Sequence, residues 1–318
     1  MEHRALGSSG IDVSRVILGC GNFGGIGSAP AHFGQGETRD QAFAIMDAAW
    51  EAGITTFDTA DAYGGGRSEA WIGEWLGGKG PAVRDRIVLT TKTFNPMNEG
   101  GDSGLAPTRV RRQIASSLER LGVERIDLYL AHEIDPETPV AETIGVFEEL
   151  RAAGTIGAYG GSNVDVAWLE EALRHGRPSW VQNSCSLLDR RDEAGVLPLC
   201  AREGLGYTPF SPLAGGWLTG KYRPGEEPPA GSRMAVRPEP YLELRTENVW
   251  NALDDLRTLA AERATSMATL AFAWLLAQPQ VSAVVVGPRR PEQLEPALQA
   301  LTLRLSPPEA EAIGELFA

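Results

Sequence analysis

The stretch Ile87-Val-Leu-Thr-Thr91 opens with three aliphatic residues in a row, and no polar residue alternates with them. Val16-Ile-Leu-Gly19 and Ala283-Val-Val-Val-Gly287 have the same character. Runs of this kind are typical of parallel strands, because helices cover such strands on both faces and leave no face for water. The sequence therefore predicts a parallel sheet that is packed against helices.

Similar runs recur along the chain, and segments with apolar residues at three- and four-residue spacing lie between them. The predicted strands are Val16–Leu18, Ile54–Phe57, Ile87–Thr91, Ile126–Ala131, Ile156–Tyr159, Trp180–Asn183, Leu205–Phe210 and Ala283–Val286. The helical patterns include Ala42, Ile45, Met46 and Ala49, then Val110, Ile114, Leu118 and Leu121, then Ile144, Phe147 and Leu150, and later Leu270, Ala273, Trp274 and Ala277. Eight strand–helix units in about 300 residues predict an α/β fold, the closed (β/α)8 TIM barrel. A doubly wound open sheet is the competing interpretation.

Two segments depart from this alternation. Residues Arg4–Val13 have the pattern of a hairpin around Ser9 and Gly10, which we expect to close the bottom of the barrel. After the seventh strand, residues 211–246 are rich in glycine and proline, and long loops of this kind in compact domains usually bind ligands. No linker or further repeat interrupts the pattern, so residues 1–318 are expected to form a single domain.

Composition excludes several classes of function. The 318 residues include 29 Lys and Arg against 42 Asp and Glu, a net charge of −13, so neither a nucleic-acid nor a membrane partner is expected. Cys20, Cys185 and Cys200 are odd in number and widely spaced, which favours neither disulfides nor a metal site. The chain shows no signal-like or membrane-spanning apolar run. We expect a cytoplasmic protein, a monomer or small homo-oligomer, that acts on a small molecule.

One motif is misleading. Gly19-Cys-Gly-Asn-Phe-Gly24 matches the GxGxxG pattern of dinucleotide-binding sheets. That site needs a helix directly after the glycines and an acid about 20 residues further on, at the end of the second strand. Residues 25–34 contain too much glycine and proline for a helix, and Asp58 follows Gly24 by 34 residues. We interpret the segment as a loop above the first strand.

The chemistry is expected where three successive strands end. Asp58, Lys92 and His132 each lie at the carboxyl end of one strand, and Tyr63 follows in the loop after the first. All carboxyl ends of a barrel open onto one face, so the four side chains are expected to converge. Each residue alone has an ordinary explanation, as a turn, cap or packing residue. A buried ammonium, however, needs a partner, and Asp58 is the nearest candidate for Lys92.

Physical chemistry suggests a role for each of the four. A phenol, with an ordinary pKa of about 10, is a weak acid at neutral pH. A neighbouring ammonium favours the phenolate and lowers that pKa, and a carboxylate holds the ammonium in place. Tyr63 would then be a general acid, Lys92 would tune it and Asp58 would anchor Lys92, while a neutral His132 donates to the same substrate oxygen. This set protonates a carbonyl oxygen while carbon receives a hydride, which implies a nicotinamide cofactor.

The chain resembles the aldo-keto reductases over nearly its whole length. The matching stretches are Phe57-Asp-Thr-Ala60, Tyr63-Gly64, Ser68-Glu69, Lys92, His132, Gly160-Gly-Ser-Asn163, Gln182-Asn183, Ser211-Pro-Leu213, Leu218-Thr-Gly-Lys-Tyr222, Gly287 and Gln293. The resemblance implies the (β/α)8 barrel and a catalytic tetrad of Asp58, Tyr63, Lys92 and His132. It also implies NADPH/NADP+ as the cofactor, bound extended without a Rossmann motif, with NADH as the alternative.

The resemblance further implies the cofactor contacts. Ser162, Asn163 and Gln182 correspond to residues that hold the nicotinamide carboxamide, and Phe210 to an aromatic residue on its ring. The loop from Ser211 corresponds to the pyrophosphate clasp, and Arg289 to the 2′-phosphate site, since its fork of donors suits phosphate. The full set is Gly19, Asp58, Ser162, Asn163, Gln182, Phe210, Ser211, Pro212, Leu213, Gly215, Lys221, Gly287, Arg289 and Gln293.

Two departures from the family pattern concern specificity. Pro296 and Ala297 follow Glu295 where the family frequently has a Glu-Asn pair that contacts adenine. Glu133 follows His132 where many members have an aromatic residue, so the substrate wall is expected to be more polar. The expected function is NADP(H)-dependent reduction of an aldehyde or ketone to an alcohol. The alternatives are a weakly catalytic, cofactor-sensing binding subunit of the same fold and a lyase that uses Lys92 as a Schiff-base nucleophile.

Overall fold

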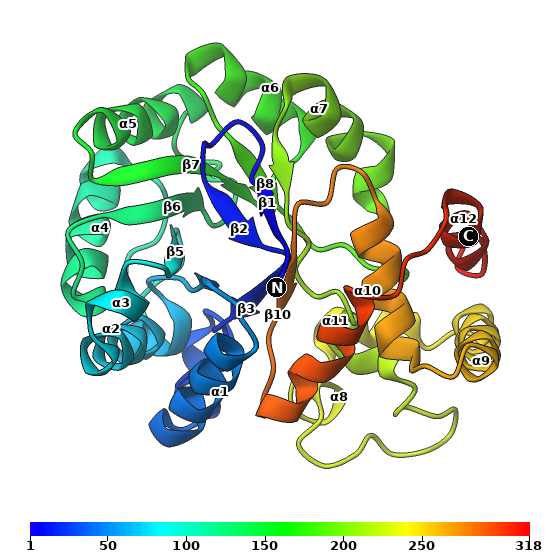
Figure 1. Cartoon of the computed structure of the whole chain (residues 1–318). Helices are drawn as coiled ribbons and strands as arrows, with labels where there is room; N and C mark the ends of the chain where they lie inside the picture. Colours follow the sequence, from blue (N-terminus) through cyan, green and yellow to red (C-terminus); the bar gives the residue numbers. More distant parts are fainter.

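The computed structural model describes residues 1–318, and an eight-stranded parallel barrel occupies its centre (Figure 1). The strands are β3 (Val16–Gly19), β4 (Thr56–Asp58), β5 (Val88–Thr93), β6 (Ile126–Ala131), β7 (Ile156–Ser162), β8 (Trp180–Gln182), β9 (Gly206–Tyr207) and β10 (Val284–Val286), and β10 pairs with β3. The segments of β9 and β10 close the barrel: a bridge joins Tyr207 to Val281, and the backbone amide of Val285 donates to the carbonyl oxygen of Pro209. The predicted barrel is confirmed, and the open doubly wound sheet is excluded.

Helices surround the strands as an outer layer. They are α1 (Arg39–Glu51), α2 (Arg67–Lys79), α3 (Pro81–Arg84), α4 (Pro107–Leu121), α5 (Val140–Ala152), α6 (Val166–His175), α7 (Val196–Glu203), α8 (Arg233–Val236), α9 (Glu247–Glu262), α10 (Met267–Ala277), α11 (Glu295–Ala300) and α12 (Pro307–Glu315). The start of α1 shows why a helix begins where it does, since Thr38 and Gln41 form a capping box. The loop Cys20–Thr38 precedes it and contains only the short 3₁₀ helix η1 (Pro30–His32), so no regular helix directly follows the GxGxxG motif, as predicted.

The strands follow the predicted runs, with ends shifted by up to three residues, as in β4 and β7, and with one larger exception. The run Leu205–Phe210 was expected to be a strand, but only Gly206 and Tyr207 are assigned to β9. Pro209 has no amide hydrogen and therefore cannot donate to a neighbouring strand. The chain nevertheless continues beside β8, because the amide of Phe210 donates to the carbonyl oxygen of Asn183 and a bridge joins Ser184 to Phe210.

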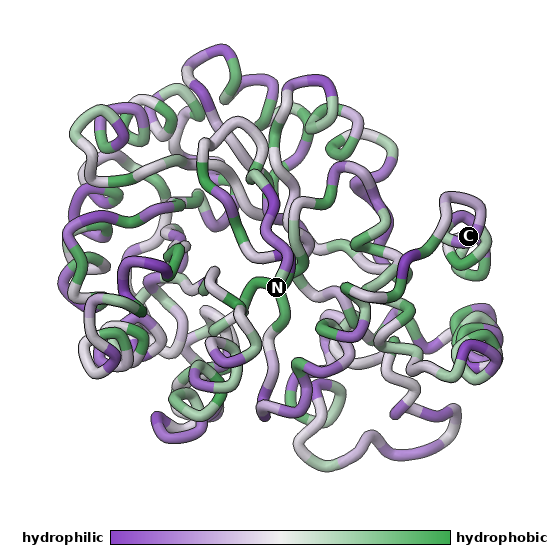
Figure 2. Tube along the Cα trace, in the orientation of Figure 1, coloured by the Kyte–Doolittle hydropathy of each residue, from purple (hydrophilic) through white to green (hydrophobic).

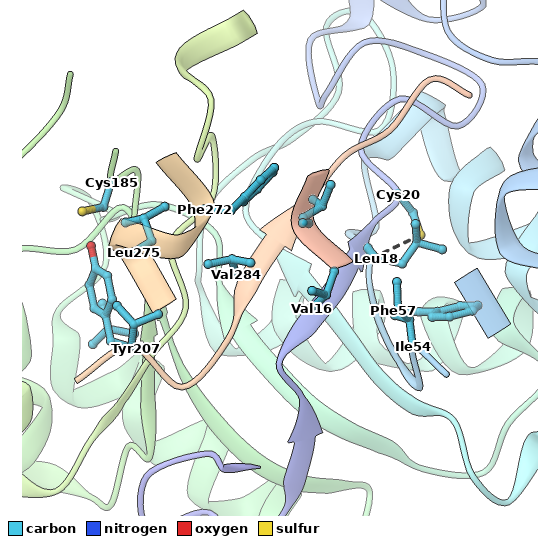
Figure 3. Packing of buried hydrophobic residues seen from close by; sticks show 14 of the residues in the cluster. Val16, Leu18, Cys20, Ile54, Phe57, Cys185, Tyr207, Phe272, Leu275 and Val284 are labelled. Atoms are coloured by element: carbon cyan, nitrogen blue, oxygen red, sulfur yellow. Dashed lines mark hydrogen bonds between the residues drawn. The ribbon is translucent and has the colours of Figure 1, made fainter. Parts of the chain in front are cut away.

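The core has two parts. The larger cluster packs strand side chains such as Val16 and Val284 against the surrounding helices, among them Phe272 of α10 (Figure 3). The smaller cluster fills the inside of the barrel and includes Ile17 and Trp180. Apolar segments gather in the interior of the trace, while polar segments lie mostly on its outer helices and loops (Figure 2). Side chains thus fill the barrel, and only its rim is left to bind a ligand.

The predicted N-terminal hairpin is present and lies across one end of the barrel (Figure 1). It pairs β1 (His3–Ala5) with β2 (Asp12–Ser14) in antiparallel register. Leu6 is fully buried and belongs to the cluster inside the barrel. Gly7 has a positive φ of 51°, and a Cβ there would lie 2.2 Å from the amide nitrogen of Gly206, so glycine is required where the hairpin meets the barrel. The hairpin closes the end opposite to the strand carboxyl ends.

The segment after β9 is largely irregular, as expected. Short 3₁₀ helices at Ala214–Thr219 (η4) and Glu239–Leu244 (η5), together with α8, are the helical turns within residues 211–246. Across the whole chain, no helix combines the length and apolar character that a membrane span requires.

A buried polar cluster lies between the barrel and the helices α2 and α4. Thr93 of β5 donates to Oδ2 of Asp61 at 2.7 Å, and Glu69 of α2 accepts from Thr91 and forms an ion pair with Arg120. Asp61 is fully buried, and its other oxygen, Oδ1, has no partner. Burial, and secondarily the charge of Glu69, raises the pKa of Asp61 from 3.8 to about 7.

We predict that Asp61→Asn removes a pH dependence of stability. Folded Asp61 keeps its proton up to about pH 7, whereas unfolded Asp61 releases it near 3.8, so the free energy of unfolding of the wild type falls as the pH rises between these values. The variant should lack this slope and gain up to about 4 kcal/mol relative to the wild type over that interval. Urea unfolding across this range measures the difference, with exposed Asp255→Asn as the control. Parallel curves for wild type and Asp61→Asn would contradict the assignment.

Candidate active site

The carboxyl ends of β4, β5 and β6 bring the four predicted catalytic side chains together. Asp58 is the last residue of β4, Lys92 lies in β5 and His132 directly follows β6. Asp58 is paired in register with Thr90, so Lys92, two residues further along β5, faces the same side of the sheet. Tyr63 begins the short helix η2 (Tyr63–Gly66) in the loop after β4. The sequence therefore placed all four on the correct rim.

Lys92 is buried, and its ammonium has three oxygen neighbours. Nζ donates to Oδ2 of Asp58 at 2.6 Å and to the carbonyl oxygen of Thr59 at 2.8 Å, and it lies 3.4 Å from the hydroxyl oxygen of Tyr63. Burial has the largest single effect on the pKa of Lys92 and lowers it, but the charges and hydrogen bonds of Asp58 and Tyr63 together outweigh burial, and the net effect raises that pKa. The lysine is thus a fixed cation beside the phenol at neutral pH.

The phenol of Tyr63 lies between Lys92 and His132. Nζ of Lys92 is 5.0 Å from the centre of the tyrosine ring, and the rings of Tyr63 and His132 meet edge to face with centroids 5.5 Å apart. Desolvation raises the pKa of Tyr63, and the charge of Lys92 opposes this increase without cancelling it. The expectation of a lowered pKa is therefore wrong in its net direction, because burial has the larger effect. Tyr63 keeps its proton and can donate it.

His132 is neutral and has a defined tautomer. Burial, with a smaller contribution from the charge of Lys92, holds the pKa of His132 well below its ordinary value. Its Nδ1 lies 3.3 Å from the amide nitrogen of Asn95. An amide nitrogen only donates, so Nδ1 accepts and the ring proton is on Nε2. His132 can therefore donate a hydrogen bond from Nε2, the role expected for it.

The next two strands, β7 and β8, end beside the four catalytic candidates. Ser162 is the last residue of β7, and Asn163 follows in a left-handed backbone conformation with φ of 54°. This conformation is costly for a residue with a side chain, and such strain is concentrated at functional sites. The side-chain Nδ2 of Asn163 donates to the carbonyl oxygen of His132 at 3.0 Å and to Oε1 of Glu133 at 3.2 Å.

Gln182 and Phe210 also reach this rim, but Gln182 already has a partner. Its Nε2 donates to Oδ1 of Asp58 at 3.0 Å, so both oxygens of that carboxylate are satisfied, one by Gln182 and one by Lys92. Gln182 therefore helps to position Asp58, a contact that the resemblance did not imply. Phe210 is half-buried and packs against the apolar cluster inside the barrel.

Glu133 is an unexpected titratable group at the same rim. It is half-buried directly after His132, and burial raises its pKa to about 7. Near neutral pH its carboxyl group therefore exists in both forms, as a hydrogen-bond donor and as an acceptor. The polar substrate wall expected from the sequence is thus an acid whose charge is easily changed.

The segment after β9 has an unusual backbone. Four residues in the left-handed region occur close together, namely Ser211, Ala214, Gly215 and Gly216. At Gly216 a Cβ would lie 2.5 Å from Nζ of Lys221, so the absent side chain makes room for the lysine. Pro212 is buried, and Leu213 packs against the large core cluster. At the other side of the rim, Gly19 and Gly287 adjoin each other at the ends of β3 and β10.

Three cations gather near this segment in a chain of net charge −13. Partial desolvation, followed by the charges of Arg233 and Arg289, lowers the pKa of Lys221. Burial, with smaller effects from Arg237 and Arg289, lowers the pKa of Arg233. Arg233, Lys221 and Arg289, hereafter the cation cluster, therefore act on one another, and such crowding of like charges favours the binding of an anion.

Arg289 is engaged by three segments of the chain. Its Nε donates to Oε1 of Glu37 at 2.6 Å, and its Nη1 donates to the carbonyl oxygen of Gly231 at 2.6 Å. Its backbone amide donates to Oε1 of Gln293 at 2.7 Å. Glu37 is buried, and burial raises its pKa although Arg289 acts in the opposite direction. The arginine at the predicted phosphate position is thus paired with an acid of the first loop.

These features fit an extended cofactor that carries phosphates. The cation cluster suits phosphate groups, glycines allow a close approach of backbone, and the strained Asn163 lies next to the catalytic candidates. Some contributors had no sequence signal. Asn95, Glu37 and Gly231 lie in loops without a motif, Arg233 begins the one-turn helix α8, and the partners of all four are distant in sequence. The carbonyl oxygen of Thr59, which accepts from Lys92, differs from these contributors, because Thr59 directly follows Asp58 in the predicted motif.

Comparison with known proteins places the chain among relatives. A model of the Aldo/keto reductase family matches residues 15–317. The chain is 33% identical to the NADH-specific methylglyoxal reductase of Escherichia coli K12, with 99% of this chain and 98% of that protein covered. It is 32% identical to the L-glyceraldehyde 3-phosphate reductase of the same organism, with 100% and 93% covered. It is 31% identical to the probable voltage-gated potassium channel subunit beta of Oryza sativa subsp. japonica, with 95% and 91% covered.

The family match spans nearly the whole chain, and the relatives are aligned over nearly their whole lengths. The predicted resemblance is confirmed: the chain belongs to the aldo/keto reductase family, a family of oxidoreductases built on this barrel.

Proposed function

We propose that the protein is an NADP(H)-dependent reductase that converts an aldehyde or ketone to an alcohol. The observation that carries the proposal is the ammonium of Lys92, held by Asp58 at 2.6 Å and placed 3.4 Å from the hydroxyl of Tyr63. A protonated phenol beside a fixed cation is the equipment of a general acid. The measurement that tests the whole proposal is the loss of NADPH or NADH absorbance with a panel of aldehydes, ketones and sugars.

The mechanism divides the work between the cofactor and the chain. A bound nicotinamide cofactor supplies the hydride. Nε2 of His132 donates a hydrogen bond that orients the carbonyl oxygen of the substrate. The hydroxyl of Tyr63 then gives its proton to that oxygen as negative charge develops there. Lys92 stabilises the resulting phenolate, because its ammonium is already in place and needs no reorganisation. Asp58 keeps Lys92 charged throughout.

The residues that would hold the cofactor line the rim in order around the barrel. Ser162, Asn163 and Gln182 would hold the nicotinamide carboxamide, with Phe210 against its ring. The pyrophosphate would lie along Ser211, Pro212, Leu213 and Gly215, near Lys221. Gly287, Arg289 and Gln293 would hold the adenosine end, with Arg289 at the 2′-phosphate. We propose NADPH as the preferred cofactor because the cation cluster is concentrated at this end.

The substrate is proposed to be a small, polar carbonyl compound. Glu133 replaces an aromatic wall with a carboxyl group beside His132, which suits a substrate with hydroxyl groups near its carbonyl. Two relatives are named for small polar carbonyl substrates: methylglyoxal, which has a second carbonyl group, and L-glyceraldehyde 3-phosphate, which has a hydroxyl group beside its carbonyl.

A Schiff-base lyase is disfavoured by the state of Lys92. A lysine nucleophile must lose its proton, whereas this ammonium is paired with Asp58 and its pKa is raised. A cofactor-sensing role is the second candidate, and the rice relative named as a probable channel subunit beta favours it. Tight NADPH binding with almost no turnover over the whole carbonyl panel would select sensing over reduction.

We predict that Tyr63→Phe removes the proton donor and lowers kcat by a factor on the order of 10²–10⁴, the usual range for general acid catalysis. Cofactor binding and thermal stability should be retained, because only a hydroxyl group is lost. The matched control is Tyr129→Phe, which removes a buried hydroxyl that has no hydrogen-bond partner. Steady-state kinetics and cofactor titration make the comparison, and an undiminished kcat in Tyr63→Phe would refute the role of Tyr63.

A second prediction concerns the cation. Lys92→Met should lower kcat and raise the pKa of Tyr63 further, so that the alkaline limb of the pH–rate profile moves to higher pH. Loss of Lys92 leaves Asp58 buried without its partner, so the double variant Lys92→Met with Asp58→Asn guards against unfolding. A profile with unchanged shape and height in the folded variants would make Lys92 purely structural.

A third prediction concerns the phosphate end. Arg289→Ala should raise KM for NADPH much more than KM for NADH, with little change in kcat, because the lost contact is remote from the reacting atoms. The neighbouring Arg290→Ala, an exposed arginine, is the control for the change in net charge. Equal KM values for the two cofactors in the unmutated enzyme would contradict the proposed preference.

A further inference from the structure

Glu37 is a buried acid set against the cation cluster. Its side chain is almost inaccessible to solvent, at 3% exposure. Its backbone is fixed in the loop before α1, because its amide donates to the carbonyl oxygen of Asn22 at 2.9 Å and its own carbonyl oxygen accepts from Gly24 at 3.0 Å. The carboxylate is therefore held in position by the fold and is not free to swing into solvent.

Glu37 occupies donors of Arg289 that a phosphate would use. Nε of Arg289 donates to Glu37 and Nη1 donates to Gly231, which leaves Nη2 as the one guanidinium nitrogen without an acceptor in the protein. A phosphate bound by a fork needs two neighbouring nitrogens of the guanidinium. Nη1 keeps a second N–H beside the two of Nη2, so a phosphate can still bind across these two nitrogens, but the fork that includes Nε is open to it only if Glu37 is displaced.

The second carboxylate oxygen of Glu37 also disfavours the binding of a phosphate at Arg289. Oε2 is buried and has no hydrogen-bond partner, although Arg233 lies close enough for its charge to act on Glu37. Part of the negative charge of Glu37 is thus left unneutralised next to Arg289. A phosphate dianion that approaches the exposed side of Arg289 meets this charge at short range, and the burial of Glu37 itself limits how far water screens the repulsion.

We propose that Glu37 sets the cofactor preference: its carboxylate holds Arg289 in the manner of a phosphate and weakens the binding of a cofactor with a 2′-phosphate relative to one without. This inference rests on the proposed function, since it requires a nicotinamide cofactor at this rim. NADH brings no charge to Arg289 and leaves the pair with Glu37 intact. A 2′-phosphate on Arg289 either displaces Glu37 from Nε or binds beside its negative charge, so the preference for NADPH is smaller than the cation cluster alone would give.

The decisive variant is Glu37→Gln, which keeps the shape of the side chain and removes its charge. Fluorescence titration of the full chain with NADPH and with NADH gives both Kd values without any turnover. We expect the ratio of Kd for NADH to Kd for NADPH to rise about tenfold or more, as is usual when a close like charge is removed. The matched control is Glu292→Gln, which removes an exposed carboxylate three residues from Arg289 and should leave the ratio within about twofold.

Arg289 provides the internal check. In an Arg289→Ala background, Glu37→Gln should raise the ratio by a clearly smaller factor, because the part of its effect that acts through the pair with Arg289 is gone and only direct repulsion of the phosphate is left. Competition by 2′,5′-ADP and by 5′-AMP isolates the adenosine end, and Glu37→Gln should strengthen only the former. An unchanged or lower ratio in Glu37→Gln, or an equal rise in the Arg289→Ala background, overturns the inference.

Failure of this inference can be distinguished from misfolding of the variant and from failure of the proposed function. If Glu37→Gln does not fold, Glu37→Asp withdraws the carboxylate from Arg289 by one methylene group and should also raise the ratio, and an unchanged ratio there counts against the inference. If the wild-type chain binds neither NADPH nor NADH, the proposed function itself fails. If the wild type binds both cofactors and only the ratio is insensitive to Glu37, the proposed function stands and this inference alone is wrong.

Discussion

The ion pair between Lys92 and Asp58 is the constraint on which the candidate active site depends. Both side chains are almost fully buried, and an ammonium in such a setting is stable only with a close anion. The register of β4 with β5 supplies that anion, since Asp58 lies opposite Thr90 and Lys92 follows on the same face. The pairing of β4 with β5 therefore makes the buried ammonium of Lys92 stable, because it places Asp58 next to it.

The states of the other two groups follow from this pair. The charge of Lys92 works against a proton on His132 and against a proton on Tyr63, but burial acts on the two in opposite senses. Burial disfavours the charged form of each, so the imidazole loses its proton and the phenol keeps its own. One desolvated pocket thus produces a neutral donor at His132 and a protonated acid at Tyr63. Asn95 then fixes which nitrogen of His132 carries the proton.

The parts of the molecule that the sequence predicted are those that depend on local pattern. The run Ile126–Ala131 became β6 without change, because a mainly apolar run of this length reports burial on both faces. The four catalytic candidates could be placed because each lies at, or a few residues beyond, the carboxyl end of a strand. The run Leu205–Phe210 was only partly a strand, since Pro209 cannot donate. The direction of the net shift in the pKa of Tyr63 was predicted wrongly, because the depth of burial depends on side chains packed from several elements.

The pair of Glu37 with Arg289 could not be predicted for a different reason. The two residues are 252 positions apart, and each lies in a loop whose conformation no period or motif determines. Their pairing also has a physical logic. Lys221, Arg233 and Arg289 repel one another. Desolvation, together with this repulsion, lowers the pKa values of Lys221 and Arg233. A buried carboxylate relieves the repulsion when no phosphate is bound, and it competes with a phosphate when one arrives. If Glu37 acts as we infer, the same residue stabilises the folded rim and limits the preference for NADPH. Selection for a stable rim then opposes selection for a stronger preference for NADPH.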